Sequence, residues 1–218
     1  MLRKIFSVTI LLTLLLTACG QKLPEVDADK AVTAYAQLYT CGTIDDDLKH
    51  AVNLSDADIA EARAQIVAPL IRALEQYPLA DETIRGLTEK FLDRLQHVMD
   101  IKVKLKDGDK ERPTVELVTT TINPATVEIF AEEDDDLNAL KAHLAELKVQ
   151  GVTDDKLKAN PEIQKLAFEA IGKFVGGFNI NERATILVPC KIVTGADGKL
   201  YWQPEDVAAI AQHITGQK

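Results

Sequence analysis

The sequence predicts an α+β fold in which a curved antiparallel sheet of about four or five strands packs against several helices. Apolar residues recur at helical spacing in several long segments, and twice the period changes from 3.6 to 2, at residues 101–122 and 184–202. A turn rich in aspartate and glycine divides each alternating region, which is typical of a hairpin. Between the hairpins, at about residues 133–178, the helical period returns and predicts a helical insertion.

Three helices are expected before the first hairpin. The first runs over about 27–41, with Asp27 as a plausible N-cap and Gly42 placed to stop it. The second opens at Ser55, a favoured capping residue followed by acidic side chains that suit the positive end of a helix dipole. Pro69 should kink this helix, because proline removes a backbone donor. The third covers about 80–98.

The first hairpin combines a strand at 101–105, which alternates lysines with apolar residues, and a return strand at about 114–122. Residues 126–130 are interpreted as a short extended piece. The insertion contains an acidic run that leads into an amphipathic helix, and a helix that opens with Asn160 as cap and Pro161 in the first turn. The second hairpin precedes a closing helix at about 204–214.

The first 18 residues have the organisation of an export signal. Arg3 and Lys4 precede an apolar stretch at 5–16, and small residues follow. This stretch is shorter than the ~20 residues that a helix needs to cross a bilayer, so a permanent transmembrane anchor is the less favoured alternative. The segment Leu16-Thr17-Ala18-Cys19 resembles the lipobox of bacterial lipoproteins. That resemblance implies that the thiol of Cys19 is acylated and that the chain is cut before it.

Acylation would hold the protein outside the cytoplasm, on the bacterial cell envelope. Two or more chains, such as palmitate, retain a protein on a bilayer far longer than one chain does. Gly20 is not acidic, which in a two-membrane bacterium implies transfer to the outer membrane; a one-membrane bacterium would keep the protein on its surface. We therefore expect a signal peptide at 1–18, a lipidated cysteine and tether at 19–26 and one domain at 27–218.

The charge of the chain excludes some partners. Removal of the leader takes away Arg3 and Lys4, so the formal net charge changes from −9 to −11. This balance argues against nucleic acid and anionic lipid headgroups as partners, because both need basic patches. The remaining 200 residues suffice for one domain, and a hydrophobic content of 46% in the whole chain suffices for a buried core.

Two cysteines remain once Cys19 is assigned to lipid. Cys41 lies on the apolar stripe of the first helix, and Cys190 alternates in register with inward residues of a strand. Disulfides are permitted outside the cytoplasm. The sequence therefore predicts a bridge between Cys41 and Cys190 that joins the first helix to the sheet. Two buried free thiols are the alternative.

The order of elements resembles that of a group of bacterial lipoproteins without an assigned function, whose domain is similar to the nuclear-transport-factor-like, or cystatin-like, fold. The resemblance is carried by the opening helix at 28–39, the strand pair at 101–122 and the Asp-Gly-Lys-x-x-Trp hairpin at 197–202. It implies a bent sheet around a cone-shaped hollow, which is either filled or holds a ligand. The insertion at 133–178 departs from that pattern, and no functional residues transfer from the family.

Few residues are candidates for chemistry. The four histidines are dispersed without metal-ligand spacing. Asp93 and His97 lie one helical turn apart, which suits either base catalysis or, as the favoured interpretation, a plain surface pair. Asp134 begins a sequence like a calcium loop, but Ala139 stands where glycine is required. No metal or cofactor is predicted.

Tyr201 and Trp202, at the end of a strand, are candidates for lining a ligand pocket, because aromatic residues are common there. Packing in the core or at the sheet edge is the alternative. The sequence as a whole predicts a membrane-anchored envelope lipoprotein that binds a protein partner or a small ligand without catalysis. An enzyme that uses a carboxylate or His97 inside the hollow is the second hypothesis, which buried acids around a cavity would support, and a structural spacer is the third.

Overall fold

The computed structural model describes residues 22–106, 109–122, 124–178 and 182–215. The predicted signal peptide and Cys19 lie outside these residues. The helices and strands follow in this order: α2 (Ala28–Cys41), the short 3₁₀ helix η1 (Lys49–Ala51), α3 (Asp56–Leu74), α4 (Asp81–Val98), β1 (Ile101–Leu105), β2 (Thr114–Thr120), α5 (Pro124–Glu133), α6 (Asp135–Val149), α7 (Asp154–Lys158), α8 (Pro161–Gly177), β3 (Arg183–Thr194), β4 (Leu200–Pro204) and α9 (Val207–Thr215).

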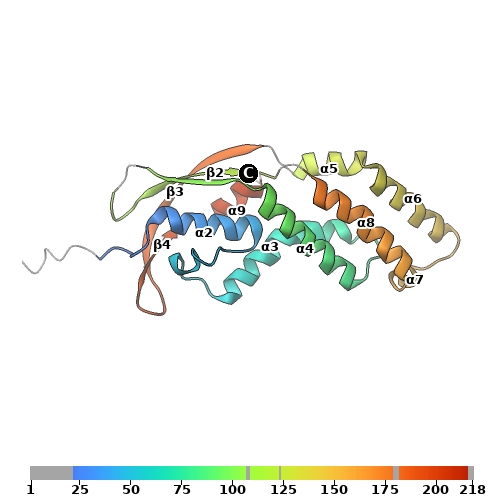
Figure 1. Ribbon diagram of the computed structural model, residues 1–218, viewed down its shortest axis with the longest axis horizontal. Coiled ribbons are helices and arrows are strands. Elements are labelled where there is room, and N and C mark those ends of the chain that lie inside the picture. Colours follow the sequence, from blue (N-terminus) through green and yellow to red (C-terminus); the bar gives the residue numbers. More distant parts are fainter. Residues whose placement is uncertain (1–21, 107–108, 123, 179–181, 216–218) are drawn as a thin grey trace, which may run out of the picture.

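The described strands form a four-stranded sheet in the order β1-β2-β3-β4, and every neighbouring pair is antiparallel. The two predicted hairpins are joined because β2 pairs with β3, which places Leu117 opposite Ile186. The long strand β3 bends from the upper edge of the molecule down to the β3–β4 turn (Figure 1). The prediction of an α+β fold with a curved antiparallel sheet is confirmed.

Helix α2 packs on one face of the sheet. Alternate residues of β2 and β3, including Val115, Leu117 and Val188, point toward it and are buried. Leu38 of α2 and Ile210 of α9 belong to the same buried cluster. Because strand side chains alternate between faces, this register turns the intervening residues of each strand to the opposite side of the sheet.

The ends of the first helices follow local chemistry. Asp27 occupies the N-cap position of α2, and Gly42 ends the helix with a left-handed φ of 70°, where its N–H donates to the Leu38 carbonyl oxygen at 2.9 Å. Helix α3 begins with a capping box in which Ser55 and Asp58 satisfy each other's backbone N–H groups. Pro69 lies inside α3, and the helix continues through it to Leu74.

The helical insertion forms a second core. Buried residues of α6, α7 and α8, including Leu140, Leu157 and Ile171, cluster with Leu87 of α4. Helix α4 therefore links this cluster to the part of the molecule that contains the sheet. The insertion occupies the end of the long axis opposite to the tether, which enters beside α2 (Figure 1).

Two features of the insertion differ from the prediction. Residues 126–130 are not an extended piece, because they lie inside helix α5. Proline is favoured in the first turn of a helix, and here Pro124 opens a segment in which alanines and glutamates outweigh the strand preference of Val127 and Ile129. The short helix α7 was not predicted, because five residues are too few to show a helical period.

Candidate binding groove

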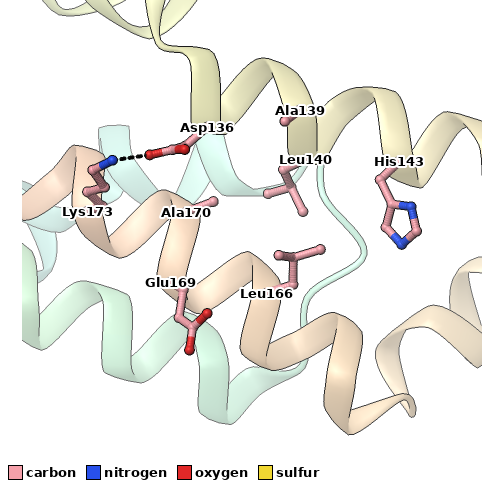
Figure 2. A pocket seen from close by; sticks show the side chains of 8 residues that line it. All are labelled: Asp136, Ala139, Leu140, His143, Leu166, Glu169, Ala170 and Lys173. Carbon is pink, nitrogen blue, oxygen red and sulfur yellow. Dashed lines mark hydrogen bonds and ion pairs between the residues drawn. The ribbon is translucent and has the colours of Figure 1, made fainter.

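A groove with a volume of about 410 Å³ lies between α6 and α8. Figure 2 shows Leu140 and Leu166 pointing toward each other between the two helices, whereas Glu169 points away from α6. The residues that line it are Asp136, Ala139, Leu140, His143, Leu166, Glu169, Ala170 and Lys173.

The lining residues follow the spacing of a helical stripe on both sides. On α6 they occupy positions i, i+3, i+4 and i+7 from Asp136, and on α8 they occupy the same positions from Leu166. The two helices run antiparallel, since Asp136 near the start of α6 meets Lys173 near the end of α8. The groove therefore follows the helix axes, with His143 and Leu166 near its other end (Figure 2).

Capping interactions fix where both helices begin. The side chain of Asp134 accepts a hydrogen bond from the Leu137 N–H at 2.9 Å. The side chain of Asn160 accepts from the Glu162 and Ile163 N–H groups at 2.9 and 3.3 Å. Such caps satisfy donors that a helix start leaves unpaired, so the acidic run before α6 has a structural role.

The floor of the groove is apolar and its rim is charged. Leu140 and Ala170 are buried, whereas Leu166 is 40% exposed. Lys173 and Asp136 form an ion pair at one end, and the hydrogen bond from Lys173 to Asp136 raises the pKa of the lysine. Lys173 is largely exposed and Asp136 is about half exposed, so we expect this ion pair to contribute little to the stability of the fold.

The groove suits an apolar segment that carries polar groups at its ends. Ala139 and Ala170 are small, so the opening between the helices is not filled by the side chains at these positions. Among residues 22–106, 109–122, 124–178 and 182–215, no group of three or more His, Cys, Asp or Glu side chains is placed to hold a metal ion.

A second cleft, of about 260 Å³, lies where the tether meets the β3–β4 turn. Tyr201 lines it, together with tether residues 22–26 and His50. The Tyr201 hydroxyl donates to Asp197 Oδ2 at 2.8 Å, and this hydrogen bond raises the pKa of the tyrosine. The Lys199 N–H and the tyrosine hydroxyl both donate to Asp197 and lower its pKa.

The other aromatic candidate lies elsewhere. Trp202 is 6% exposed and packs in the cluster between α2 and the sheet, with Cys190 and Tyr35. Neighbouring strand residues point to opposite faces, so Tyr201 and Trp202 do not meet in one pocket. The space between helix and sheet, which the resemblance allowed to be hollow, is occupied by this cluster.

The predicted bridge between Cys41 and Cys190 is absent from the structure, in which both residues are free and buried. Cys190 belongs with Tyr35 to the buried cluster between α2 and the sheet, and Cys41, the last residue of α2, is not among the residues of that cluster. Cys41 lies six helical residues beyond Tyr35, about 9 Å along the axis.

The histidine pair of the second hypothesis lies on the surface. The side chains of His97 and Asp93 are 67% and 71% exposed, and His97 Nδ1 lies 3.8 Å from Asp93 Oδ1. His97 Nδ1 instead donates to the Asp93 backbone oxygen at 2.7 Å. An exposed pair on the outside of α4 has no enclosed space in which to act on a substrate.

Sequence reasoning missed the groove. His143 was noted only as one of four dispersed histidines, and no pattern links residues 136–143 to residues 166–173. A weak signal exists in Leu166, a leucine beside the buried stripe of Ile163, Ala167 and Ala170 rather than on it. A leucine in that position indicates an apolar surface left for another contact.

The fold and the groove define a class: an α+β protein with one open antiparallel sheet and a helical insertion that carries a surface groove. In the part of the chain that the structure describes, no helix has both the length and the apolar character to cross a membrane. No family model matches the chain, and no curated protein does.

Among solved structures, the fold is similar to that of a "putative lipoprotein (ycdA)" from Bacillus subtilis subsp. subtilis str. 168. The TM-score is 0.58 and the identity is 14%, over 86% of this chain and 56% of the other. The present chain thus matches little more than half the length of that protein, and the likeness concerns the fold.

Proposed function

We propose that this protein is a lipid-anchored lipoprotein of a bacterial cell envelope that binds another protein through the groove between α6 and α8. The anchoring part is supported by the lipobox-like segment that ends at Cys19. The likeness in fold to a protein described as a lipoprotein adds support. We also propose that the sheet with α2 is a cystatin-like or nuclear-transport-factor-like domain, since an antiparallel meander packed on its first helix fits that pattern.

The groove is the observation that carries the binding role. Two antiparallel helices present matching stripes with a buried apolar floor and a charged end. A third helix packs well along such a channel, because its own i, i+3, i+4 and i+7 side chains fit between the two ridges. The proposed partner segment is therefore an amphipathic helix with leucine-sized side chains on one face.

An enzymatic role has less support. Among the described residues, the carboxyl groups whose pKa departs from its ordinary value are those of Asp46, Asp58 and Asp197. In each of them, hydrogen bonds at the surface lower the pKa. A general acid at neutral pH requires the opposite shift, caused by burial. Binding is therefore the better explanation of the geometry.

Two variants of α6 test the groove. Ala139 lines it, whereas Ala145 is an exposed alanine of the same helix outside the groove. Ala139→Trp fills the channel, and Ala145→Trp adds the same bulk elsewhere.

A photo-reactive residue at Leu166 in living cells should form an adduct with a partner, and the same residue at Val149, which is 88% exposed, should not.

The cross-linked segment is then made as a synthetic peptide, and its affinity for the purified protein is measured. We expect an amphipathic helical peptide that binds the native chain and Ala145→Trp equally and Ala139→Trp at least about tenfold more weakly. Equal adducts at Leu166 and Val149, or equal affinities for the two tryptophan variants, would rule out the groove as the binding site.

A further inference from the structure

The face of the sheet opposite to α2 carries no helix among the described residues (Figure 1). We call it the open face and define it by Lys102, Lys104, Glu116, Arg183, Leu187 and Lys191. Cross-strand register sets Lys104 opposite Glu116 and Glu116 opposite Leu187, so these three form a row across β1, β2 and β3. The inward neighbours Val115, Leu117 and Val188 are buried.

The open face is basic in an acidic protein. With Asp100 and Lys106 at its ends it carries five basic and two acidic side chains, in a chain whose formal net charge is −9. Asp100 pairs with Lys102 at 3.2 Å and with Arg183 at 2.5 Å, and Glu116 pairs with Lys106 at 2.8 Å.

Two lysines of the open face take no part in these ion pairs. Lys104 and Lys191 are exposed and have no ion-pair partner among the residues that the structure describes. An excess of positive charge on one face attracts an anionic partner even where the whole chain is negative, because screening limits electrostatic attraction to about 10 Å.

The same face also carries an exposed apolar side chain. Leu187 is 61% exposed in the middle of β3, and it has the partly buried Glu116 opposite it. Leu187 shares the open face with Lys104, which lies beyond Glu116 in the same row, and with Arg183 and Lys191, four residues before and after it on β3. An exposed leucine on a face that also carries basic side chains suits the boundary between headgroups and acyl chains, where charge and apolar burial act together.

The tether reaches the β4 edge of the sheet, beside the β3–β4 turn. Trp202 points into the core, so Tyr201 points outward, and Tyr201 shares a cleft with tether residues 22–26. Cys19 precedes Lys22 by three residues, and each residue spans at most about 3.6 Å. A bilayer that holds acyl chains on Cys19 would thus lie within roughly 11 Å of this edge of the sheet.

We propose that the open face lies against the anionic headgroups of the bilayer to which Cys19 is anchored. Lys102, Lys104, Arg183 and Lys191 bind phosphate groups, and Leu187 enters the headgroup layer. This inference rests on the proposed anchoring. It also differs from the expectation that the negative net charge of the chain excludes anionic lipid headgroups as partners, because the basic residues of this face lie together on one side of the sheet. An acidic protein is a less favoured occupant, because the tether brings the bilayer to this edge.

Fluorescence quenching tests the orientation. The full mature protein, purified with its lipid, carries an environment-sensitive fluorophore at Leu187→Cys or at Val149→Cys and is reconstituted with quencher-bearing lipids. The native thiols of Cys41 and Cys190 are buried, so the introduced cysteine is labelled. Vesicles contain phosphatidylcholine with or without phosphatidylglycerol.

We expect quenching at position 187 to increase about threefold when phosphatidylglycerol is present and to fall back at high salt, whereas position 149 stays unquenched. Lys104→Glu with Lys191→Glu should abolish the increase. Lys141→Glu with Lys158→Glu, an equal change of charge at exposed positions of the insertion, should leave it intact.

The possible failures are distinguishable. Protein that floats with vesicles of either composition, while position 187 stays unquenched, would overturn the orientation and leave the anchoring intact; this is also the result if an acidic protein is the true occupant. Quenching that is equal with and without phosphatidylglycerol would overturn the role of the basic residues. Protein that fails to float at all would contradict the proposed anchoring itself.

Discussion

Burial controls the chemistry of the two described cysteines. Desolvation, with a smaller contribution from Asp45, raises the pKa of Cys41 to about 12. Desolvation, with a smaller contribution from Glu205, raises the pKa of Cys190 to about 12 as well. Both thiols are therefore neutral and protected in the folded protein, and a neutral thiol is a poor nucleophile.

These pKa values predict a pH dependence of stability. The ordinary thiol pKa is 9.0, so above that pH the unfolded chain releases protons that the folded chain keeps. The stabilisation is complete below about pH 9 and is lost between about pH 9 and 12, at up to about 1.4 kcal/mol per pH unit for each thiol.

Denaturant titrations at several pH values measure the free energy of unfolding. We expect the native chain to lose more stability above about pH 9 than the Cys41→Ala/Cys190→Ala variant does. A thiol reagent at neutral pH should react with both residues only after denaturation. Rapid reaction with the folded protein would contradict the buried placement, and failure to react after denaturation would restore the predicted disulfide.

The residue scale also shows what a sequence pattern can and cannot place. The alternation of apolar residues correctly predicts that Cys190 points inward, and the apolar stripe of α2 correctly predicts the same for Cys41. Both statements concern one element at a time. Whether two inward side chains meet depends on where along α2 the strand crosses the helix. A periodic pattern in the sequence gives the direction of a side chain, but it does not give the position of that crossing.

At the scale of elements, one side chain joins α8 to the rest of the molecule. Gln164 accepts hydrogen bonds from the Ala80 N–H at 2.8 Å and the Thr83 hydroxyl at 2.9 Å. It donates to the carbonyl oxygens of Pro78 and Leu157, both at 3.0 Å. Its amide therefore connects the start of α4 with α7 and α8.

Replacing this amide should loosen the insertion. Gln164→Met leaves partly buried backbone groups without a partner, and we expect it to lower the free energy of unfolding by about 2–3 kcal/mol. Gln150→Met is the matched control, because Gln150 is exposed and its amide bonds only Glu146 within its own helix turn. Equal effects in chemical denaturation would show that the Gln164 network does not hold α8 in place.

Elements with long, regular patterns were predicted well. Helices α2, α3, α4 and α8 and both hairpins follow the apolar periods, and Asn160 and Gly42 mark ends that lie within a residue or two of the prediction. Helix α5 was missed because β-branched residues at 127–129 imitate a strand. The preference of this segment for helix or strand is weak, and Pro124 at the first helical position favours the helix.

At the scale of the whole molecule, the sequence predicted the class of fold and the insertion, since both follow from the order of elements. The groove and the open face required the structure. Each is formed by residues far apart in the chain, such as Asp136 with Lys173 or Lys104 with Leu187, and depends on how helices and strands are placed side by side.

The tether and the sheet lie toward one end of the long axis, and α6 and α8, which form the groove, lie at the other end (Figure 1). The proposed orientation of the open face depends on acylation of the Cys19 thiol, whereas the proposed binding in the groove does not.

Mass spectrometry of the protein isolated from native membranes tests that chemistry most directly. The account predicts a mature N-terminal peptide that begins at Cys19 and carries the added mass of two or more acyl chains. A chain that retains residues 1–18, or a peptide with an unmodified Cys19, would contradict the anchoring and with it the orientation of the open face.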